Sequence, residues 1–457
     1  MHGVEARARL LTAVVLLGSL VLAGCSGDPS PPKPSHSQTK AAEPTTLTFG
    51  VWGSEDQTDP FKPVVDTFNS LSEGSDVTLR RYASHDDLLN EVEDGGNGAP
   101  DVFMIQRRDL ARLVTDRKVR PVDEPLVQRG MDFGDDYSRD AILALSADNH
   151  LMCMPYGISP MVIYYNTELI DFAKLALRGK PVPNADQTSW GLAAMSAAAK
   201  QASRKGHGTR GIYVEPTISA LAPFILSGGG DVYNDPTNPT SLAFSESGSQ
   251  SALEQTLELL RNPHLTLSDA QLKKHTPLEW FERGKLAMVE GFRDLVPQLR
   301  QVHGLDFDVI QMPSLGAQRT VGDITGLCIR RDTVDPVTAA DFVFHAVSDE
   351  QVSRVVRAGY LVPANLSVAN SEDFLQANRL PHHADVFNTA ARSIVVPPLV
   401  PDLSALEAAV RPTLVEMLTV PVIEDLAQLT AKIDAESVPV LTQQSTQSPS
   451  DSASPTG

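Results

Sequence analysis

Apolar and polar residues are arranged along the central part of the chain so that strand patterns and helix patterns follow one another. Residues 47–52 show the alternation of a strand, and residues 61–68 carry apolar side chains at the i, i+3, i+4 and i+7 spacing of one helix face. Residues 77–82 and 101–105 predict two further strands, with a short helix at 85–92 between them. This order predicts an α/β fold, a parallel or mixed sheet with helices on both faces and ligands at the carboxyl ends of strands.

Helical patterns return in the second half of the chain. Residues 190–202, 247–262 and 277–284 have helical spacing, and Asp335-Pro336 supplies an N-cap and a first-turn proline for a further helix. The sequence contains no internal repeat. It therefore predicts an ordinary globular α/β protein rather than a repeat array.

The N-terminal residues predict export from the cytoplasm. Arg7 and Arg9 precede a mainly apolar run at residues 10–22, as in signal segments. That run is shorter than the ~20 apolar residues of a membrane-spanning helix. It ends in Leu-Ala-Gly-Cys25, which resembles the bacterial lipobox, where cleavage leaves an acylated N-terminal cysteine. We expect a signal peptide at 1–24 and lipidation of Cys25, with an ordinary cleavage site before an unmodified cysteine as the alternative.

Composition divides the remaining chain into three parts. Residues 25–45 are rich in Ser, Pro, Lys and Thr and predict a flexible stalk behind the lipid anchor, and residues 442–457 predict a disordered tail. The roughly 400 residues between them correspond to about two domains.

The charge and the cysteines exclude some classes of protein and leave one question open. With 38 basic and 57 acidic residues, the chain has a net charge of −19, which argues against nucleic acid as a partner. After Cys25 only Cys153 and Cys328 remain, and they form either a disulfide or two buried thiols. Their separation and the lone pair His382-His383 do not have zinc-ligand spacing, so no metal or other cofactor is expected.

The sequence does not predict an enzyme. It has no G-x-S-x-G, H-E-x-x-H or P-loop motif. Adjacent acidic pairs such as Asp86-Asp87 and Asp135-Asp136 are expected in so acidic a chain, and neighbouring residues cannot flank one glycosidic bond. We therefore assign no catalytic residues.

Seven segments of the chain match the motifs of one protein family, in the order and spacing of that family. Chance explains such agreement poorly. The segments are 99–105 (APDVFMI) with 110–114 and 119–124 (VRPVDE), 154–157 (MPYG) with 162–168 (VIYYNTE), 188–190 (TSW), 228–231 (GGGD) with Asn234, 281–288 (FERGKLAM) with Gly291, 321–326 (VGDITG) and 359–364 (GYLVPA). Together they resemble bacterial extracellular solute-binding proteins of the maltose- and trehalose-binding type. The resemblance covers about residues 47–430, and the segment at 281–288 is its most specific part.

The resemblance implies a periplasmic-binding-protein-like fold of two α/β lobes, each a mixed sheet with helices on both faces. Strands would cross between the lobes near Tyr165, Thr320 and Pro363. The N-lobe would then comprise residues 46–165 and 321–363, and the C-lobe residues 166–320 and 364–441. Ligand would bind in the cleft and close the lobes about this hinge.

The function that the resemblance implies is ligand capture for an ABC importer. A monomeric lipoprotein on the extracytoplasmic face of the cell membrane would bind a carbohydrate or sugar-like solute and deliver it to the permease subunits and their ATPase. A ligand-sensing or protein-docking lipoprotein without transport is one alternative. A binder of a phosphate-bearing solute such as a glycerophosphodiester is another.

A sugar is bound by planar polar side chains and by aromatic rings that cover its apolar face. The candidate ligand-binding residues, placed in segments that border the cleft in the family or at strand ends, are Trp52, Gln106, Tyr156, Phe292, Arg293, Asp323 and Tyr360. Gln106 and Phe292 stand where the family often has Asp and Trp, so the identity of the sugar cannot be transferred from a relative.

Each candidate also has a plainer interpretation. Trp52 could pack on a lobe surface, Tyr156 and Tyr360 could pack in the hinge, and Arg293 could pair with a surface carboxylate instead of a hydroxyl or phosphate. Residues 228–230 read as a plain turn more readily than as a ligand-contacting loop. We interpret Trp190 and Trp280 as structural.

Overall fold

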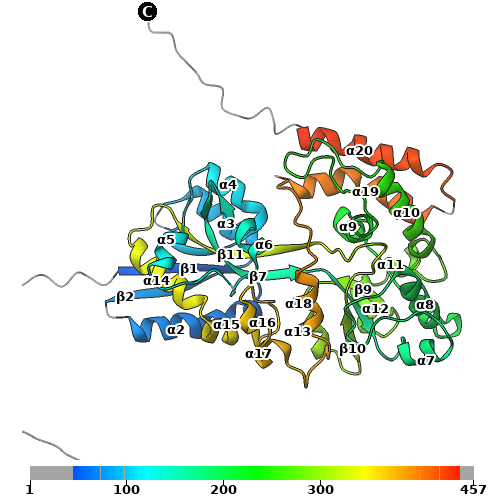
Figure 1. Ribbon diagram of the computed structural model, residues 1–457, viewed down its shortest axis with the longest axis horizontal. Helices are drawn as coiled ribbons and strands as arrows, with labels where there is room; N and C mark the ends of the chain where they lie inside the picture. The colour runs from blue at the N-terminus through cyan, green and yellow to red at the C-terminus, as the bar shows by residue number, and fades with distance from the viewer. Residues whose placement is uncertain are drawn as a thin grey trace, which may run out of the picture. The chain divides into compact units, whose positions relative to one another are not determined.

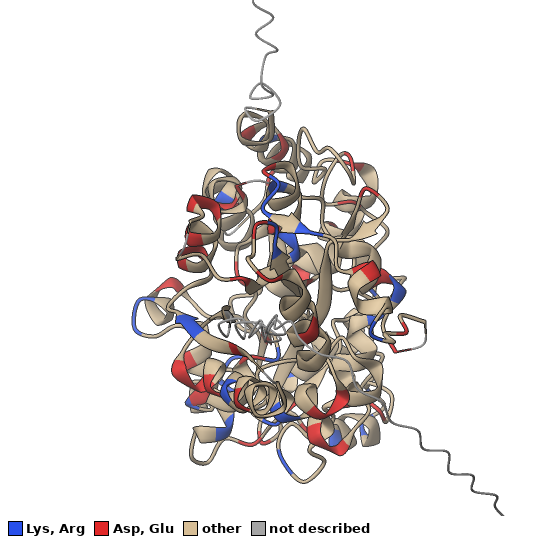
Figure 2. Cartoon of the chain, turned by 90° about the vertical axis from the view of Figure 1, so that its left-hand side faces the viewer, with Lys and Arg blue, Asp and Glu red and all other residues tan. Residues whose placement is uncertain are grey.

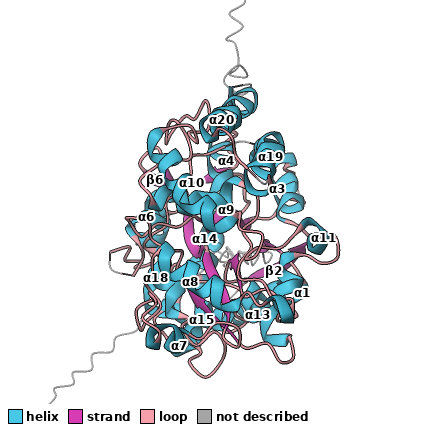
Figure 3. Ribbon diagram, turned by 90° about the vertical axis from the view of Figure 1, so that its right-hand side faces the viewer, coloured by secondary structure: helices cyan, strands magenta, loops and turns pink. Residues whose placement is uncertain are grey.

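The computed structural model describes residues 45–442, apart from residues 73, 97, 135, 401 and 421 (Figure 1). The predicted signal peptide, the anchor at Cys25 and the stalk up to residue 44 lie outside the described residues, as does the tail from residue 443. The described part contains a six-stranded and a three-stranded β-sheet, both surrounded by helices, and a two-stranded hairpin (Figure 3). We call the larger sheet with its helices the first lobe, and the smaller sheet with its helices the second lobe.

The first lobe is built on a mixed six-stranded sheet. Its strand order is β2-β1-β3-β11-β4, with β7 also paired to β11; β1 is parallel to β2 and β3, and β11 is antiparallel to β3, β4 and β7. The strands are β1 (Thr45–Trp52), β2 (Ser75–Tyr82), β3 (Val102–Gln106), β4 (Val119–Arg120), β7 (Cys153–Pro160) and β11 (Gly322–Arg330). A short hairpin of β5 (Ser146–Ala147) and β6 (His150–Leu151) precedes β7.

Helices of the first lobe pack on this sheet through the predicted apolar faces. In the helix predicted from residues 61–68, Val64, Val65 and Phe68 are buried, and the Phe68 ring meets Phe342 edge to face at 5.2 Å. The helices are α1 (Glu55–Thr58), α2 (Lys62–Leu71), α3 (His85–Asp94), α4 (Leu110–Thr115), α5 (Asp123–Val127), α6 (Arg139–Ala144), α14 (Pro336–Ala346), α15 (Asp349–Val356), α16 (Leu366–Ala369) and α17 (Glu372–Leu375).

The second lobe contains the three-stranded sheet β10-β8-β9, formed by β8 (Val162–Asn166), β9 (Met288–Gly291) and β10 (Phe307–Ile310). These strands are antiparallel, and single parallel bridges from Arg210 and Tyr213 to residues 286 and 289 make the sheet mixed. Its helices are α7 (Phe172–Leu177), α8 (Leu192–Ala202), α9 (Ile218–Ser227), α10 (Ser247–Leu260), α11 (Asp269–Leu272), α12 (Pro277–Glu282), α13 (Leu295–Gln301), α18 (Asp385–Ala391), α19 (Leu403–Thr419) and α20 (Leu426–Thr442).

Strand β8 is buried on both faces, which explains its unbroken apolar sequence. Val162 and Tyr164 belong to the core that continues from the first lobe, whereas Ile163 and Tyr165 belong to the core beneath α8, α9 and α10. Successive side chains of a strand point to opposite faces, so one strand serves two cores.

Three chain segments meet where the lobes join. β7 of the first sheet runs directly into β8 of the second, and the Thr320 hydroxyl donates to the Met161 carbonyl at 2.7 Å between them. Thr320 also pairs with the segment around Ile394. Thr320, one of the predicted crossing points, thus lies at this junction; the residue boundaries of the lobes stay predictions.

A disulfide joins the antiparallel neighbours β7 and β11 of the first sheet. Cys153 of β7 and Cys328 of β11 are directly opposite each other, with Cα atoms 4.3 Å apart, and both are fully buried. The sequence allowed either a disulfide or two buried thiols, and the structure contains the disulfide.

Two further features bear on partners. In the part of the chain that the structure describes, no helix is both long and apolar enough to cross a bilayer. Acidic and basic positions are interspersed over the helices and loops in Figure 2 rather than gathered on one basic face. Phosphate backbones bind to clustered Lys and Arg, so this distribution does not favour nucleic acid.

Candidate ligand-binding cleft

A cavity of about 560 Å³ is lined by residues of both lobes. Its size lies within the usual range for small-molecule sites, about 300–1,000 Å³. The first lobe contributes the ends of β1 and β3, the start of β11 and part of β7, and the second lobe contributes α9 and the segments around Val232, Phe292 and Val400. Another hollow, of about 420 Å³, lies on α15 beside Arg354 and Arg357, whose guanidinium groups are already paired with carboxylates.

The sheet topology explains why distant candidates meet in this cavity. Trp52 and Gln106 are the last residues of the parallel neighbours β1 and β3, so both lie at the same edge of the sheet. β11 runs the other way and pairs Thr325 with Gln106, which puts its early residue Asp323 at that edge too. Trp52, Gln106 and Asp323 all line the cavity, as do Phe292 and Tyr360.

Three polar side-chain atoms of the lining are buried and have no hydrogen-bond partner among the described residues. They are Gln106 Oε1, Arg107 Nε and Thr325 Oγ1. A buried polar atom without a partner costs about 1–3 kcal/mol. Their clustering at one sheet edge therefore favours a ligand, or water in its place, that supplies the missing partners.

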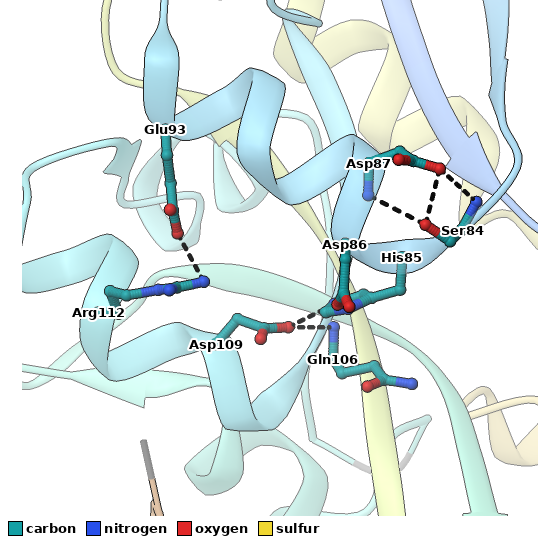
Figure 4. Close-up of polar contacts among 8 residues, drawn as sticks. All are labelled: Ser84, His85, Asp86, Asp87, Glu93, Gln106, Asp109 and Arg112. Atoms are coloured by element: carbon teal, nitrogen blue, oxygen red, sulfur yellow. Dashed lines mark hydrogen bonds and ion pairs between the residues drawn. The ribbon is translucent and has the colours of Figure 1, made fainter. Parts of the chain in front are cut away.

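One buried carboxylate, Asp109, positions Gln106 directly and Trp52 through His85; Figure 4 shows the contacts of Asp109 with Gln106 and His85. Asp109 Oδ2 accepts from the Gln106 backbone N–H at 3.1 Å and lies 2.7 Å from His85 Nε2. The His85 ring meets Trp52 edge to face, with centroids 5.0 Å apart. Burial alone would lower the pKa of His85, but its hydrogen bond to Asp109 and the attraction of that charge raise the pKa above its usual value. Asp109 and His85 thus act as positioning residues behind the cleft wall.

The charged side chains of the lining shift one another's pKa values. Burial raises the pKa of Asp323, an effect that the N–H of Ile324 at 2.8 Å and the charges of Arg108 and Arg107 partly offset. Burial lowers the pKa of Arg107, and Asp323 opposes that change. A carboxyl group and a guanidinium therefore share one desolvated wall, which suits hydrogen bonding to hydroxyls in both directions.

Two of the predicted ligand-binding residues lie outside the lining. Tyr156 is fully buried in the first lobe with its ring 5.7 Å from Phe61, which is the packing role weighed as its alternative. Arg293 is also buried, with Nε donating to the Gly359 carbonyl at 3.1 Å and Nη2 to the Phe374 carbonyl at 3.3 Å. Neither side chain is available to a ligand in the cleft, and Arg293 pairs with carbonyls rather than with a surface carboxylate.

The reason is the direction in which the side chains leave the backbone. Phe292 directly follows β9 and faces the cavity, while Arg293 begins the turn into α13 and points between the rings of Phe374 and Phe387, at 4.7 and 5.1 Å. Burial lowers the pKa of Arg293 to about 9, so it remains charged at neutral pH.

This placement predicts that Arg293 supports stability rather than affinity. Arg293→Met should lower the free energy of unfolding by about 3 kcal/mol, because two buried carbonyls lose their donor. Denaturant unfolding measures the loss, with Arg283→Met on the exposed surface as the matched control, expected within about 0.5 kcal/mol of the wild type. Equal stability of the Arg293 and Arg283 variants would contradict this role.

The glycine segment and the other tryptophans serve packing. At Gly228 and Gly230 a Cβ would collide with Ala252 and Ser249 of α10, so close helix packing requires these glycines. Trp190 donates to the Gln311 carbonyl at 2.7 Å, and Trp280 donates to the Gln271 carbonyl at 3.1 Å. None of these residues lines the cavity, in agreement with the plainer interpretations.

Sequence reasoning missed Arg107, Thr325, His85 and Asp109. Arg107 follows Gln106 at the end of β3, so the strand-end rule that selected Gln106 applied equally to its neighbour. Thr325 lies in the segment 321–326 that carried the resemblance. His85 begins α3, and its sequence context does not show that its ring meets Trp52. In the described residues no group of three or more His, Cys, Asp or Glu side chains is arranged to hold a metal.

Residues 64–382 match the sequence model of the bacterial extracellular solute-binding proteins. Because the match spans more than half of the 457 residues, the chain belongs to this family. The family consists of solute-binding proteins, which agrees with the prediction that the chain is not an enzyme.

Solved structures with the same fold come from several bacteria. An ABC substrate-binding protein of Listeria monocytogenes in complex with cycloalternan is 17% identical, with a TM-score of 0.69 over 88% of this chain and 99% of that one. The maltose-binding protein MalE of the same organism, in complex with maltose, is 16% identical, with a TM-score of 0.68 over 88% and 99%. The GacH receptor of Streptomyces glaucescens, solved with acarbose, is 18% identical, with a TM-score of 0.65 over 85% and 97%. These likenesses confirm the predicted two-lobe α/β fold.

Proposed function

We propose that this protein captures a carbohydrate or sugar-like solute in the cleft and delivers it to the permease of an ABC importer. The observation that carries the proposal is the sheet edge where an aromatic ring, Trp52, stands beside the polar groups of Gln106 and Asp323. A pyranose has an apolar face for the ring and hydroxyls for the amide and carboxyl. Structural neighbours solved with maltose, acarbose and cycloalternan support a sugar as the solute class.

The proposal includes the cellular setting predicted from the N-terminus. A lipid on Cys25 would hold a monomeric protein at the extracytoplasmic face of the cell membrane, with residues 25–45 as the stalk. Membership in an extracellular family supports this location. Mass spectrometry of the membrane-extracted protein would test it, because acylation adds the mass of the lipid to a chain that begins at Cys25.

The first experiment is a thermal screen of residues 26–457 against sugars, polyols, sugar phosphates and amino acids. A sugar at 100 times its dissociation constant should stabilise the protein by about 2.7 kcal/mol, which shifts the unfolding temperature by a few degrees. Calorimetric titration then gives the affinity of each hit. A folded protein that shows neither a shift nor heat of binding with any saccharide would refute the sugar-binding proposal.

A phosphate-bearing solute is the second candidate. The arginines that would bind its phosphate differ from the one that the sequence predicted. Arg293 is buried away from the cleft, but Arg107 and Arg108 both line it. Sugar phosphates and glycerophosphodiesters in the same screen test this candidate, and Arg107→Gln should weaken only the phosphate-bearing hits. Ligand sensing without transport would use the same cleft, so uptake of the identified solute by cells lacking this protein separates the two.

Affinity for a hydroxyl-bearing ligand is expected to fall at acid pH through Asp323. Hydroxyl donors favour the ionised carboxylate, so the ligand lowers a pKa that burial has raised in the free protein. By linkage, affinity rises as pH increases through the free-protein pKa and is constant above it. The same raised pKa means that stability declines as pH rises from the carboxyl's ordinary value, 3.8, through the raised one.

Calorimetric titrations at several pH values measure this dependence. Asp323→Asn should bind more weakly at neutral pH and lose the acid-side dependence, because the amide does not titrate. An unchanged pH profile in the Asn variant would assign the dependence to another group, such as Asp294, which also lines the cavity and whose pKa burial also raises.

A further inference from the structure

The surface that α9 contributes to the cleft is mainly aliphatic, with Ser219 as its polar lining residue, although the site is proposed to bind a polar solute. Ile218, Ala222 and Leu226 are spaced by four residues, so they form one stripe along the helix, and all three line the cavity. Val232, Val400 and Leu403 line it as well. None of these six side chains can donate or accept a hydrogen bond. We call them the aliphatic wall.

The unpartnered polar atoms of the cavity lie on the other lobe. Gln106 Oε1, Arg107 Nε and Thr325 Oγ1 belong to β3, the residue after it and β11. A sugar ring held by these atoms and Trp52 has hydroxyls around its whole edge. Ser219, Asp231 and Tyr233 of the second lobe also line the cavity and can bond hydroxyls near them. Hydroxyls turned against the aliphatic wall itself would give up water without gaining a partner, which is unfavourable. A ligand complementary to both lobes therefore has one polar end and one apolar end.

The segment that links the lobes continues the apolar surface. Val395, Val396 and the two prolines after them line the cavity, and Arg107 Nη1 donates to the Pro397 carbonyl at 2.7 Å. The polar edge of the first lobe is thus fixed directly against the apolar linking segment. A single ligand of moderate length would contact both surfaces.

From this arrangement we infer that the cleft accepts a glycoside carrying an alkyl or aryl substituent, with the sugar at Trp52, Gln106 and Asp323 and the substituent on the aliphatic wall. The inference rests on the proposed function and narrows its solute class. The competing explanation is that the aliphatic wall only closes against the first lobe around an unsubstituted sugar. The two explanations differ in how affinity responds to the length of the substituent.

A homologous ligand series on the wild-type chain, residues 26–457, tests the inference. The probes are the methyl, butyl and hexyl glycosides of glucose, galactose and maltose, titrated by calorimetry below their micelle concentrations. Burial of each methylene should strengthen binding by about twofold to fourfold. Binding of the methyl glycoside that does not strengthen with chain length would overturn the inference and leave the proposed function standing. If no glycoside and no free sugar binds, both fail.

Two controls separate a specific site from general hydrophobic binding. Hexanol should bind far more weakly than the hexyl glycoside, and equal binding would overturn the inference because the sugar would then contribute nothing. Val400→Thr, which adds a hydroxyl to the aliphatic wall at nearly constant volume, should reduce the gain per methylene. Val422→Thr, at a position 73% exposed, is the matched variant and should leave the gain unchanged. Equal gains in the two variants would overturn the placement of the substituent on the aliphatic wall.

Discussion

Loss of the Cys153–Cys328 disulfide is expected to lower the free energy of unfolding by about 3–5 kcal/mol, the largest effect on stability that we predict. The cysteines are 175 residues apart, and a cross-link over so long a loop removes much of the conformational entropy of the unfolded chain. That loop leaves the first sheet along β7, forms most of the second lobe and returns along β11. The cross-link therefore ties together the two strands from which the second lobe departs.

Denaturant unfolding of the wild type with and without reductant measures this effect. The double variant Cys153→Ala/Cys328→Ala gives an independent measurement of the loss in free energy of unfolding without reductant. Both sulfurs are fully buried, so the double variant also loses some packing and should be slightly less stable than the reduced wild type. Identical unfolding of the oxidised and reduced wild type would contradict the prediction. Alkylation of two thiols before reduction would show that the bridge does not form.

Trp52→Ala is expected to weaken solute binding by about 30-fold or more, which corresponds to about 2 kcal/mol. Trp52 lines the cavity beside Gln106, and its ring is fixed at one edge by His85. Removal of the ring takes away the flat apolar surface on which a sugar can stack and loosens the His85 contact.

Calorimetric titration with the best solute from the thermal screen measures this loss. Trp280→Ala is the matched control, because Trp280 is partly buried and donates a hydrogen bond but does not line the cavity. The control should lose stability and keep its affinity. A folded Trp52→Ala protein that binds as tightly as the wild type would remove Trp52 from the site and with it the main support for sugar stacking.

Local sequence patterns predicted the elements that build the cleft wall. The alternation at residues 47–52 and the helical spacing at 61–68 correspond to β1 and α2, because burial of one face imposes those periods directly on the sequence. The rule that ligands gather at strand ends then selected Trp52, Gln106 and Asp323. All three line the cavity, since β1 and β3 are parallel and β11 is antiparallel to β3.

The sequence by itself determined the family, the α/β class and the edge of the sheet that lines the cavity. Whether Cys153 and Cys328 are bonded depends on the pairing of β7 with β11, which only the tertiary structure decides. The same holds for Arg293, whose side chain turns into the core while its neighbour Phe292 faces the cleft. Periodicity records which residues avoid water, but the direction of a side chain in a turn and the opposite wall of a cavity depend on contacts between segments far apart in the chain.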